Sequence, residues 1–199
     1  MSKGDETRAA ILDRAVAEAS RLGLAGLTLG SLARQTGLSK SGLFAHFGSK
    51  EDLELAVLAA GVERFVARVM APAFKAPRGL PRIEALFEGW LAWHRAPDLP
   101  GGCLFVGLAN ELDDRPGPLR DRLVAYQRDW IETLATAARI AVAEGHFRAD
   151  LDCEQFAYDF YSIELAYHHF HRLLRDPDAE RRARNAFAEL VTLARAASA

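Results

Sequence analysis

Apolar residues at helical spacing run through almost every segment of this 199-residue sequence, whereas the strict alternation typical of β-strands is nowhere sustained. Half of the residues are apolar, so the chain can bury a core as one or two domains. We therefore expect an all-α protein of about nine helices. We place an N-terminal domain of three helices at residues 1–49 and a second helical domain at residues 50–199.

Glycine and proline clusters set the expected ends of the helices. The first helix carries an apolar stripe and stops at Gly23, and the fourth begins after a capping Ser49 and ends before Pro72. The expected helices are residues 5–22, 29–35, 40–47, 50–71, 81–95, 102–112, 118–144, 153–174 and 179–197. The breaker-rich segment 71–81 is expected to be a linker.

Residues 32–43 have the spacing of a helix-turn-helix. Two helices that cross at a sharp angle need a small residue at the crossing, which is Ala33, and a residue that tolerates positive φ in the turn, which is Gly37. Ser39 stands at the N-cap of the second helix, so the free N–H groups of that helix point toward an anionic partner. Three apolar residues are expected to close the core beneath: Leu32, Leu38 and Leu43.

Charge supports a local nucleic-acid surface. The whole chain has a net charge of −2, which excludes a protein coated with basic residues. From Arg21 to Lys50, however, every charged residue is basic. A helical hairpin without function is the alternative for this segment, and the acid-free stretch argues against it.

The segments Thr28-Leu29 and Ser39-Lys40-Ser41-Gly42-Leu43-Phe44-Ala45-His46-Phe47-Gly48-Ser49-Lys50-Glu51-Asp52-Leu53 resemble the signature of TetR-family regulators. The specific resemblance covers about residues 7–57. It implies a helix-turn-helix domain that binds double-stranded operator DNA, a fourth helix that leads to a variable effector domain, and a homodimer formed by the last two long helices. Repression is the commoner activity of the family, and activation stays open.

The resemblance also implies roles for single residues. Lys40, Ser41 and Gly42 would face the major groove, next to the N-cap Ser39. Thr28, His46 and Lys50 would hold phosphates. The position of Phe44 usually holds a tyrosine whose hydroxyl binds phosphate, so Phe44 can pack against sugar but cannot donate that hydrogen bond. Because Ser41 and Gly42 are small, DNA shape is expected to share in the specificity.

The helix expected at residues 153–174 is apolar on two sides, so it needs two covers. Its own core can supply one and a partner subunit the other, while a monomer with a central core helix is the alternative. The candidate interface residues are Phe156, Phe160, Ile163, Tyr167, Phe170, Phe187 and Leu190.

Large aromatic and polar-edged side chains in the second domain are candidates to line an effector pocket, although each alone is equally typical of an ordinary core. They are Trp90, Trp93, His94, Cys103, Phe105, Tyr126 and Trp130. This set suggests a small apolar or aromatic effector. About 140 residues beyond the helix-turn-helix argue against a regulator that has no effector.

Two further features suggest other functions. Cys103 is expected near a helix start, where the helix dipole favours a thiolate, and its segment is similar to one in TetR-type regulators that sense electrophiles or oxidants.

His168 and His171 share a helix face with Glu164, which leaves a metal-dependent all-α enzyme as an alternative. The spacing H-E-x-x-H, a phosphate loop and a G-x-S-x-G elbow are missing, so we expect no catalytic residue, metal or cofactor.

The remaining features concern location. The first eight residues are polar, and no apolar run approaches the roughly 18 residues of a membrane span, so we expect a soluble cytoplasmic protein without a membrane partner. Cys103 and Cys153 are too few and too far apart for a disulfide framework. Both are expected as reduced thiols.

Overall fold

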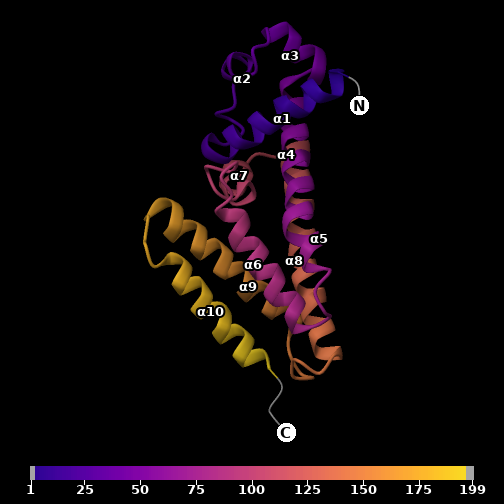
Figure 1. Cartoon of the computed structure of the whole chain (residues 1–199), viewed down its shortest axis with the longest axis vertical. Helices are drawn as coiled ribbons and strands as arrows, with labels where there is room; N and C mark the ends of the chain where they lie inside the picture. The colour runs from indigo at the N-terminus through magenta and orange to yellow at the C-terminus, as the bar shows by residue number, and fades with distance from the viewer. Residues whose placement is uncertain (1–2, 196–199) are drawn as a thin grey trace. The chain divides into compact units, whose positions relative to one another are not determined.

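The computed structural model describes residues 3–195 of the chain, which is helical almost throughout (Figure 1). No β-strand occurs within these residues, where one isolated antiparallel bridge joins Phe147 to Arg195. The expected all-α fold class is therefore confirmed. The described chain forms two compact units, residues 3–66 with 93–125 and residues 67–92 with 126–195. The predicted domain boundary between residues 49 and 50 stays a prediction.

The first unit contains the N-terminal helices and the short helix α7. Its helices are α1 (Lys3–Leu22), α2 (Leu29–Thr36), α3 (Lys40–Phe47), α4 (Lys50–Phe65) and α7 (Leu104–Leu112). The predicted stripe of α1 is buried at Ile11, Ala15 and Ala19, whereas Leu22 is 53% exposed. The buried stripe therefore ends one turn before the helix does.

The helix that begins with α4 passes through Pro72, which sequence patterns place just beyond its end. A π-helical turn, η1 (Val66–Met70), follows α4 and is itself followed by the single turn α5 (Ala71–Ala73). Pro72 lies in the first turn of α5, directly after the π-helical turn, so the chain stays helical past this proline. The expected linker is thus shorter than residues 71–81.

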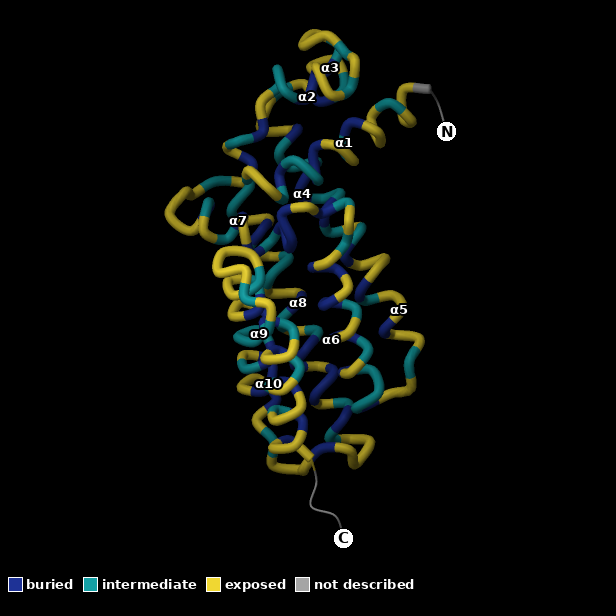
Figure 2. Tube along the Cα trace, turned by 60° about the vertical axis from the view of Figure 1, so that its left-hand side comes forward, coloured by how far each residue is buried: buried dark blue, intermediate teal, exposed yellow. Residues whose placement is uncertain are grey.

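The second unit is built around α9 (Cys153–His168) and α10 (Ala179–Ala194), which lie side by side in both views (Figures 1 and 2). The π-helical turn η2 (His169–Leu173) extends α9. Two helices have residues in both units, α6 (Leu80–His94) and α8 (Pro118–Ala143). The helix predicted to reach residue 197 ends earlier, at Ala194, because Arg195 has an extended backbone and forms the bridge to Phe147. Residues 196–199 lie outside the described part of the chain.

Aromatic rings fill the core of the second unit. Phe87 stacks on Phe187 at 4.0 Å between ring centroids, and Phe160 meets both rings edge-on at 5.9 and 5.6 Å. Such stacked and edge-to-face pairs add to the energy of burial because each ring has a negative face and a positive edge. The ring cluster therefore joins α6, α9 and α10.

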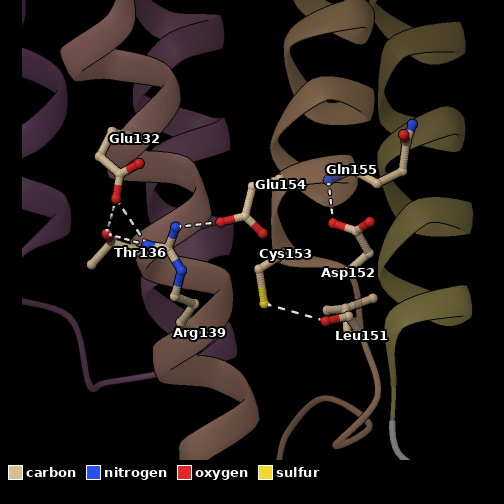
Figure 3. A network of polar contacts seen from close by, with 8 residues as sticks. All are labelled: Glu132, Thr136, Arg139, Leu151, Asp152, Cys153, Glu154 and Gln155. Atoms are coloured by element: carbon tan, nitrogen blue, oxygen red, sulfur yellow. Dashed lines mark hydrogen bonds and ion pairs between the residues drawn. The ribbon is translucent and has the colours of Figure 1, made fainter.

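A polar network fastens the start of α9 to α8 (Figure 3). Arg139 donates to Glu132 at 2.9 Å and to Glu154 at 2.5 Å, while Asp152 caps α9 by accepting from the N–H of Gln155 at 2.9 Å. The two carboxylates raise the pKa of the Arg139 guanidinium. Because these groups are exposed, their ion pairs contribute little to the free energy of folding. They link the start of α9 to one position along α8.

No helix within residues 3–195 combines the length and the apolar character that a membrane crossing requires.

Candidate nucleic-acid interface

The helix α2 is capped at both ends, and the sequence pattern identified the residue at its C-terminal end. Thr28 has an extended backbone, and its Oγ1 accepts a hydrogen bond from the N–H of Ser31 at 3.1 Å. Gly37 ends the helix with φ +69°, and the next residue, Leu38, donates its N–H to the carbonyl of Ala33 at 3.1 Å. A left-handed glycine followed by this backward hydrogen bond is the usual way to end a helix and turn the chain sharply. The predicted turn is in place.

The helix α3 begins at a side-chain cap. Ser39 Oγ accepts from the N–H of Gly42 at 3.0 Å and lies 3.0 Å from the hydroxyl of Ser41. Capping uses one of the four N–H groups that no carbonyl of the helix can reach, so the others stay available at the N-terminus. This end of α3 therefore presents backbone donors, two hydroxyls and the positive end of the helix dipole.

The two faces of α3 differ sharply in burial, as Figure 2 shows. Leu43 and Phe47 are buried on the inner face, together with Leu32 and Ala33 of α2. The outer face exposes Lys40, Ser41, Phe44 and Ala45, with Gly42 half-buried between them. Leu38, expected as a core residue, is half-buried in the turn. Apart from Lys40 and Phe44, the side chains on the outer face are short, so the helix backbone can come close to a DNA groove.

The residues expected at phosphates surround this face. Thr28 is exposed, His46 is half-buried in the last turn of α3, and Lys50 is exposed at the start of α4. Lys50 forms an ion pair with Glu54 one turn later, at 3.2 Å. The Lys50 side chain is 51% exposed and that of Glu54 is 17% exposed, so a phosphate can reach Lys50 and would compete with Glu54 for it.

Three contacts that hold the helix-turn-helix in place were missed by sequence patterns. Glu18 of α1 accepts from the hydroxyl of Ser31 at 2.9 Å and from the side-chain amide of Gln35 at 3.1 Å. The guanidinium of Arg8 lies 5.1 Å from the centre of the Phe47 ring. None of the three pairs has a local sequence signal, because the partners are 13 to 39 residues apart.

Comparison with known proteins agrees with this geometry. Residues 11–57 match the family model for bacterial regulatory proteins of the tetR family, and residues 79–187 match the model for the tetracyclin repressor-like C-terminal domain. The chain belongs to the TetR family. It is thus a TetR-family transcriptional regulator with a helix-turn-helix of the kind that binds DNA. No curated protein matches the chain at a significant level.

Solved structures share the fold over nearly the whole chain. A TetR transcriptional regulator from Chloroflexus aurantiacus is 29% identical, with a TM-score of 0.83 and coverage of 99% of this chain and 100% of that one. AibR, in complex with isovaleryl coenzyme A and operator DNA, is 21% identical (TM-score 0.72; 93% and 98% covered). The reduced form of NemR from E. coli is also 21% identical (TM-score 0.79; 98% and 100% covered).

The residues proposed to line an effector pocket fall into two groups, because they belong to both compact units. The first unit holds Trp93, His94, Cys103 and Phe105, and the second holds Trp90, Tyr126 and Trp130. In the first group the rings of Trp93 and Phe105 stack at 6.3 Å, and Phe65 of α4 meets both edge-on. All but Phe105 and Tyr126 are buried. Their role as an effector site stays a prediction.

A buried acid lies within the second group. Nε1 of Trp130 donates to the Glu164 carboxylate, at 3.2 and 3.1 Å from its two oxygens, and Glu164 is 2% exposed. Burial raises the pKa of Glu164 well above its usual value, and the Trp130 hydrogen bond opposes that shift only in part. Its place between aromatic residues on α9, in the row that contains Phe160 and Tyr167, could have identified it from sequence as a buried acid.

The residues proposed for the dimer interface differ in exposure. Phe156, Phe160, Tyr167 and Phe187 are covered within the chain. Ile163 and Leu190 are half-buried, and Phe170 is 39% exposed. Ile163 and Phe170 line an apolar groove of about 310 Å³ between α9 and α10. Of the seven candidates, only Ile163, Phe170 and Leu190 keep exposed surface, and the interface itself stays a prediction.

The histidine-rich segment gives little support to a metal site. Within the described residues, no group of three or more potential ligands lies close enough to hold a metal ion. Glu164 is directed to Trp130, and the His171 ring stacks on Tyr167 at 5.1 Å. Burial, with the nearby charge of Arg172, lowers the pKa of His168 to about 4, so His168 is neutral at physiological pH.

Proposed function

We propose that this TetR-family regulator is a homodimeric repressor that is released from its operator when a small apolar or aromatic molecule binds its C-terminal part. The observation that carries the DNA-binding half of the proposal is the outer face of α3. It combines a side-chain-capped N-terminus, exposed Lys40 and Ser41, and no acidic residue from Arg21 to Lys50. Such a face is complementary to the anionic phosphate backbone of double-stranded DNA and to the base edges in its grooves.

Reading would begin at the N-terminal turn of α3. Lys40 can reach base edges such as the O6 and N7 acceptors of guanine, and Ser41 can either donate or accept. Gly42 adds no side chain, so the backbone can come close to the duplex. Thr28, His46 and Lys50 would hold phosphates on either side and fix the register without reading sequence.

A dimer would place two such faces on successive turns of the major groove, about 34 Å apart or farther. The apolar groove between α9 and α10 supports this arrangement, since Ile163, Ala166 and Phe170 leave apolar surface uncovered there. A second copy of the chain is the partner that this family uses, and it would cover that surface.

The effector half of the proposal depends on the aromatic residues of α6, α7 and α8. Trp90, Trp93 and Trp130 supply large apolar surfaces, and Glu164 adds one buried acid. AibR, which has the same fold, was solved with both an acyl coenzyme A and operator DNA. AibR shows that this fold can hold a small ligand, and release follows only if the ligand favours an arrangement of the two units that binds DNA less tightly.

The test is a fluorescence-anisotropy titration of labelled duplexes selected from a random-sequence pool. Lys40→Ala is expected to weaken binding at least about tenfold, because one charge-assisted contact is lost. Lys75→Ala, an exposed lysine of the second unit, is the matched control and should leave binding unchanged. Equal effects of the two variants would contradict the assignment of α3 as the reading helix.

Effector release is tested by adding aromatic acids, lipophilic amines and acyl coenzyme A thioesters to the same titration. At least one class should raise the melting temperature of the protein and weaken its binding to DNA at the same concentrations. Ligand-controlled repression would be contradicted if every class that stabilises the protein left its binding to DNA unchanged.

A second candidate mechanism is thiol sensing, favoured by the position of Cys103 at the N-cap of α7. Neither Cys103 nor Cys153 is in a disulfide, both are buried, and Cys103 is 5% exposed. N-ethylmaleimide would react with Cys103 only after local opening, and the adduct should weaken DNA binding in a Cys153→Ser background. Unchanged binding after complete modification of Cys103 would exclude this mechanism.

A further inference from the structure

The helix α7 is fastened to the C-terminal end of α1 at its N-terminal side. The N–H of Gly101, in the loop before α7, donates to Oγ of Ser20 at 3.0 Å. A Cβ at Gly101 would lie 1.6 Å from the carbonyl oxygen of Ser20, so only glycine allows this approach of the two backbones. The loop is therefore held directly against the backbone of α1.

A carboxylate makes the second fastening, at the other end of α7. Oε2 of Glu111 accepts from the N–H of Leu24 at 2.8 Å, and Oε1 accepts from the N–H of Ala25 at 2.7 Å. Gly23 has φ +71°, and a Cβ there would lie 2.2 Å from Oε2. The carboxylate thus occupies the space that a side chain at residue 23 would fill.

The segment that Glu111 holds leads directly to the helix-turn-helix. Residues 23–27 connect the end of α1 to Thr28, the N-cap of α2. The two hydrogen bonds are charge-assisted, and the side chain of Leu24 is fully buried, so this turn has little freedom while the carboxylate is in place. The direction in which α2 leaves the turn then depends on a residue of α7.

We propose that Glu111 is a positioning residue for DNA binding, which holds the α1–α2 turn in the orientation that brings α3 to the duplex. Glu111 lies in the part of the chain that matches the C-terminal domain model, whereas residues 23–25 lie in the part that matches the N-terminal model. α7 is therefore a physical connection between the two sequence domains. This inference depends on the proposed DNA binding by α3.

The direction in which DNA affinity changes when Glu111 is replaced distinguishes a positioning role from a purely electrostatic one. Glu111→Gln removes a negative charge from a DNA-binding unit, so electrostatics alone would strengthen binding. Loss of one of the two charge-assisted acceptors instead predicts binding to the selected duplex about tenfold weaker. Asp114→Asn removes the same charge from an exposed residue three positions away and should leave binding equal or stronger.

The experiment compares the wild-type full chain, Glu111→Gln and Asp114→Asn by anisotropy titration, with hydrogen exchange of the Leu24 and Ala25 amides as the second measurement. Weaker binding and faster exchange in Glu111→Gln alone are the expected results. Glu111→Asp keeps the charge, but its side chain is too short to reach both amides, so this variant should also bind DNA more weakly than the wild type. It replaces Glu111→Gln in the experiment if that variant does not fold.

Faster exchange with binding as tight as that of Asp114→Asn would overturn the inference, because Glu111 would then be only a structural cap. Unchanged exchange would also overturn it. Failure of the proposed function is distinguishable from both results, because the wild-type protein would then bind no duplex at all.

Discussion

At the scale of single residues, the most unusual group is Glu164, an acid buried among aromatic rings with the indole N–H of Trp130 at 3.1 Å. An isolated carboxylate in such a place loses the hydration that stabilises its charge. The carboxyl therefore holds its proton to a higher pH than in the unfolded chain, and its ionisation opposes folding.

Replacing Glu164 with glutamine should remove a pH dependence of stability. The folded pKa lies above the unfolded value of about 4.5, so above that pH the folded state holds a proton that the unfolded state has lost. The stability of the wild type therefore falls as pH rises through the range between the two pKa values. Glutamine can still accept from Trp130. The urea midpoint of Glu164→Gln should exceed that of the wild type at pH 7 and approach it at pH 4. A difference that is constant with pH would contradict a raised pKa.

At the scale of elements, sequence patterns were most successful where the signal is local. The predicted caps Ser39 and Ser49 and the turn at Gly37 follow from short-range hydrogen bonding and backbone sterics, and α3 has the predicted bounds. Two helices end in π-helical turns, η1 and η2, which sequence periodicity does not distinguish from α-helix.

Contacts between distant residues were beyond the reach of these patterns. The hydrogen bonds of Glu111 span 86 and 87 residues, and those of Glu18 span 13 and 17. Such pairs depend on tertiary packing and leave no period in the sequence. Local patterns could therefore propose the surface residues of the candidate site. They could not predict Glu18 and Glu111, which hold the helix-turn-helix in place from distant parts of the sequence.

Gly37 and Gly107 make a matched pair for testing the turn. A Cβ would meet no atom within 4 Å at either position, so only the backbone differs. Gly37→Ala should cost about 1–2 kcal/mol of stability because alanine is strained at φ +69°. Gly107→Ala, inside α7, should stabilise by about 0.5–1 kcal/mol. Urea denaturation measures both, and a neutral Gly37→Ala would show that the turn can adopt another conformation.

At the scale of the whole molecule, dimerisation is expected to depend on the groove between α9 and α10. Phe170→Glu places a charge on that surface and should shift the molar mass measured by analytical ultracentrifugation from dimer toward monomer. Phe74→Glu, which replaces an aromatic residue of similar exposure far along the chain, should leave the mass unchanged. A dimer unaffected by Phe170→Glu would place the interface elsewhere.

The salt dependence of binding to double-stranded DNA tests the central claim most directly. A protein whose α3 enters the groove while Thr28, His46 and Lys50 hold phosphates should lose affinity steeply as salt rises, and Lys50→Ala should flatten the log–log slope by about one unit. Glu54→Gln, which removes the competing partner of Lys50, should raise the affinity for DNA. Purified protein with no salt-sensitive affinity for any duplex would contradict the account.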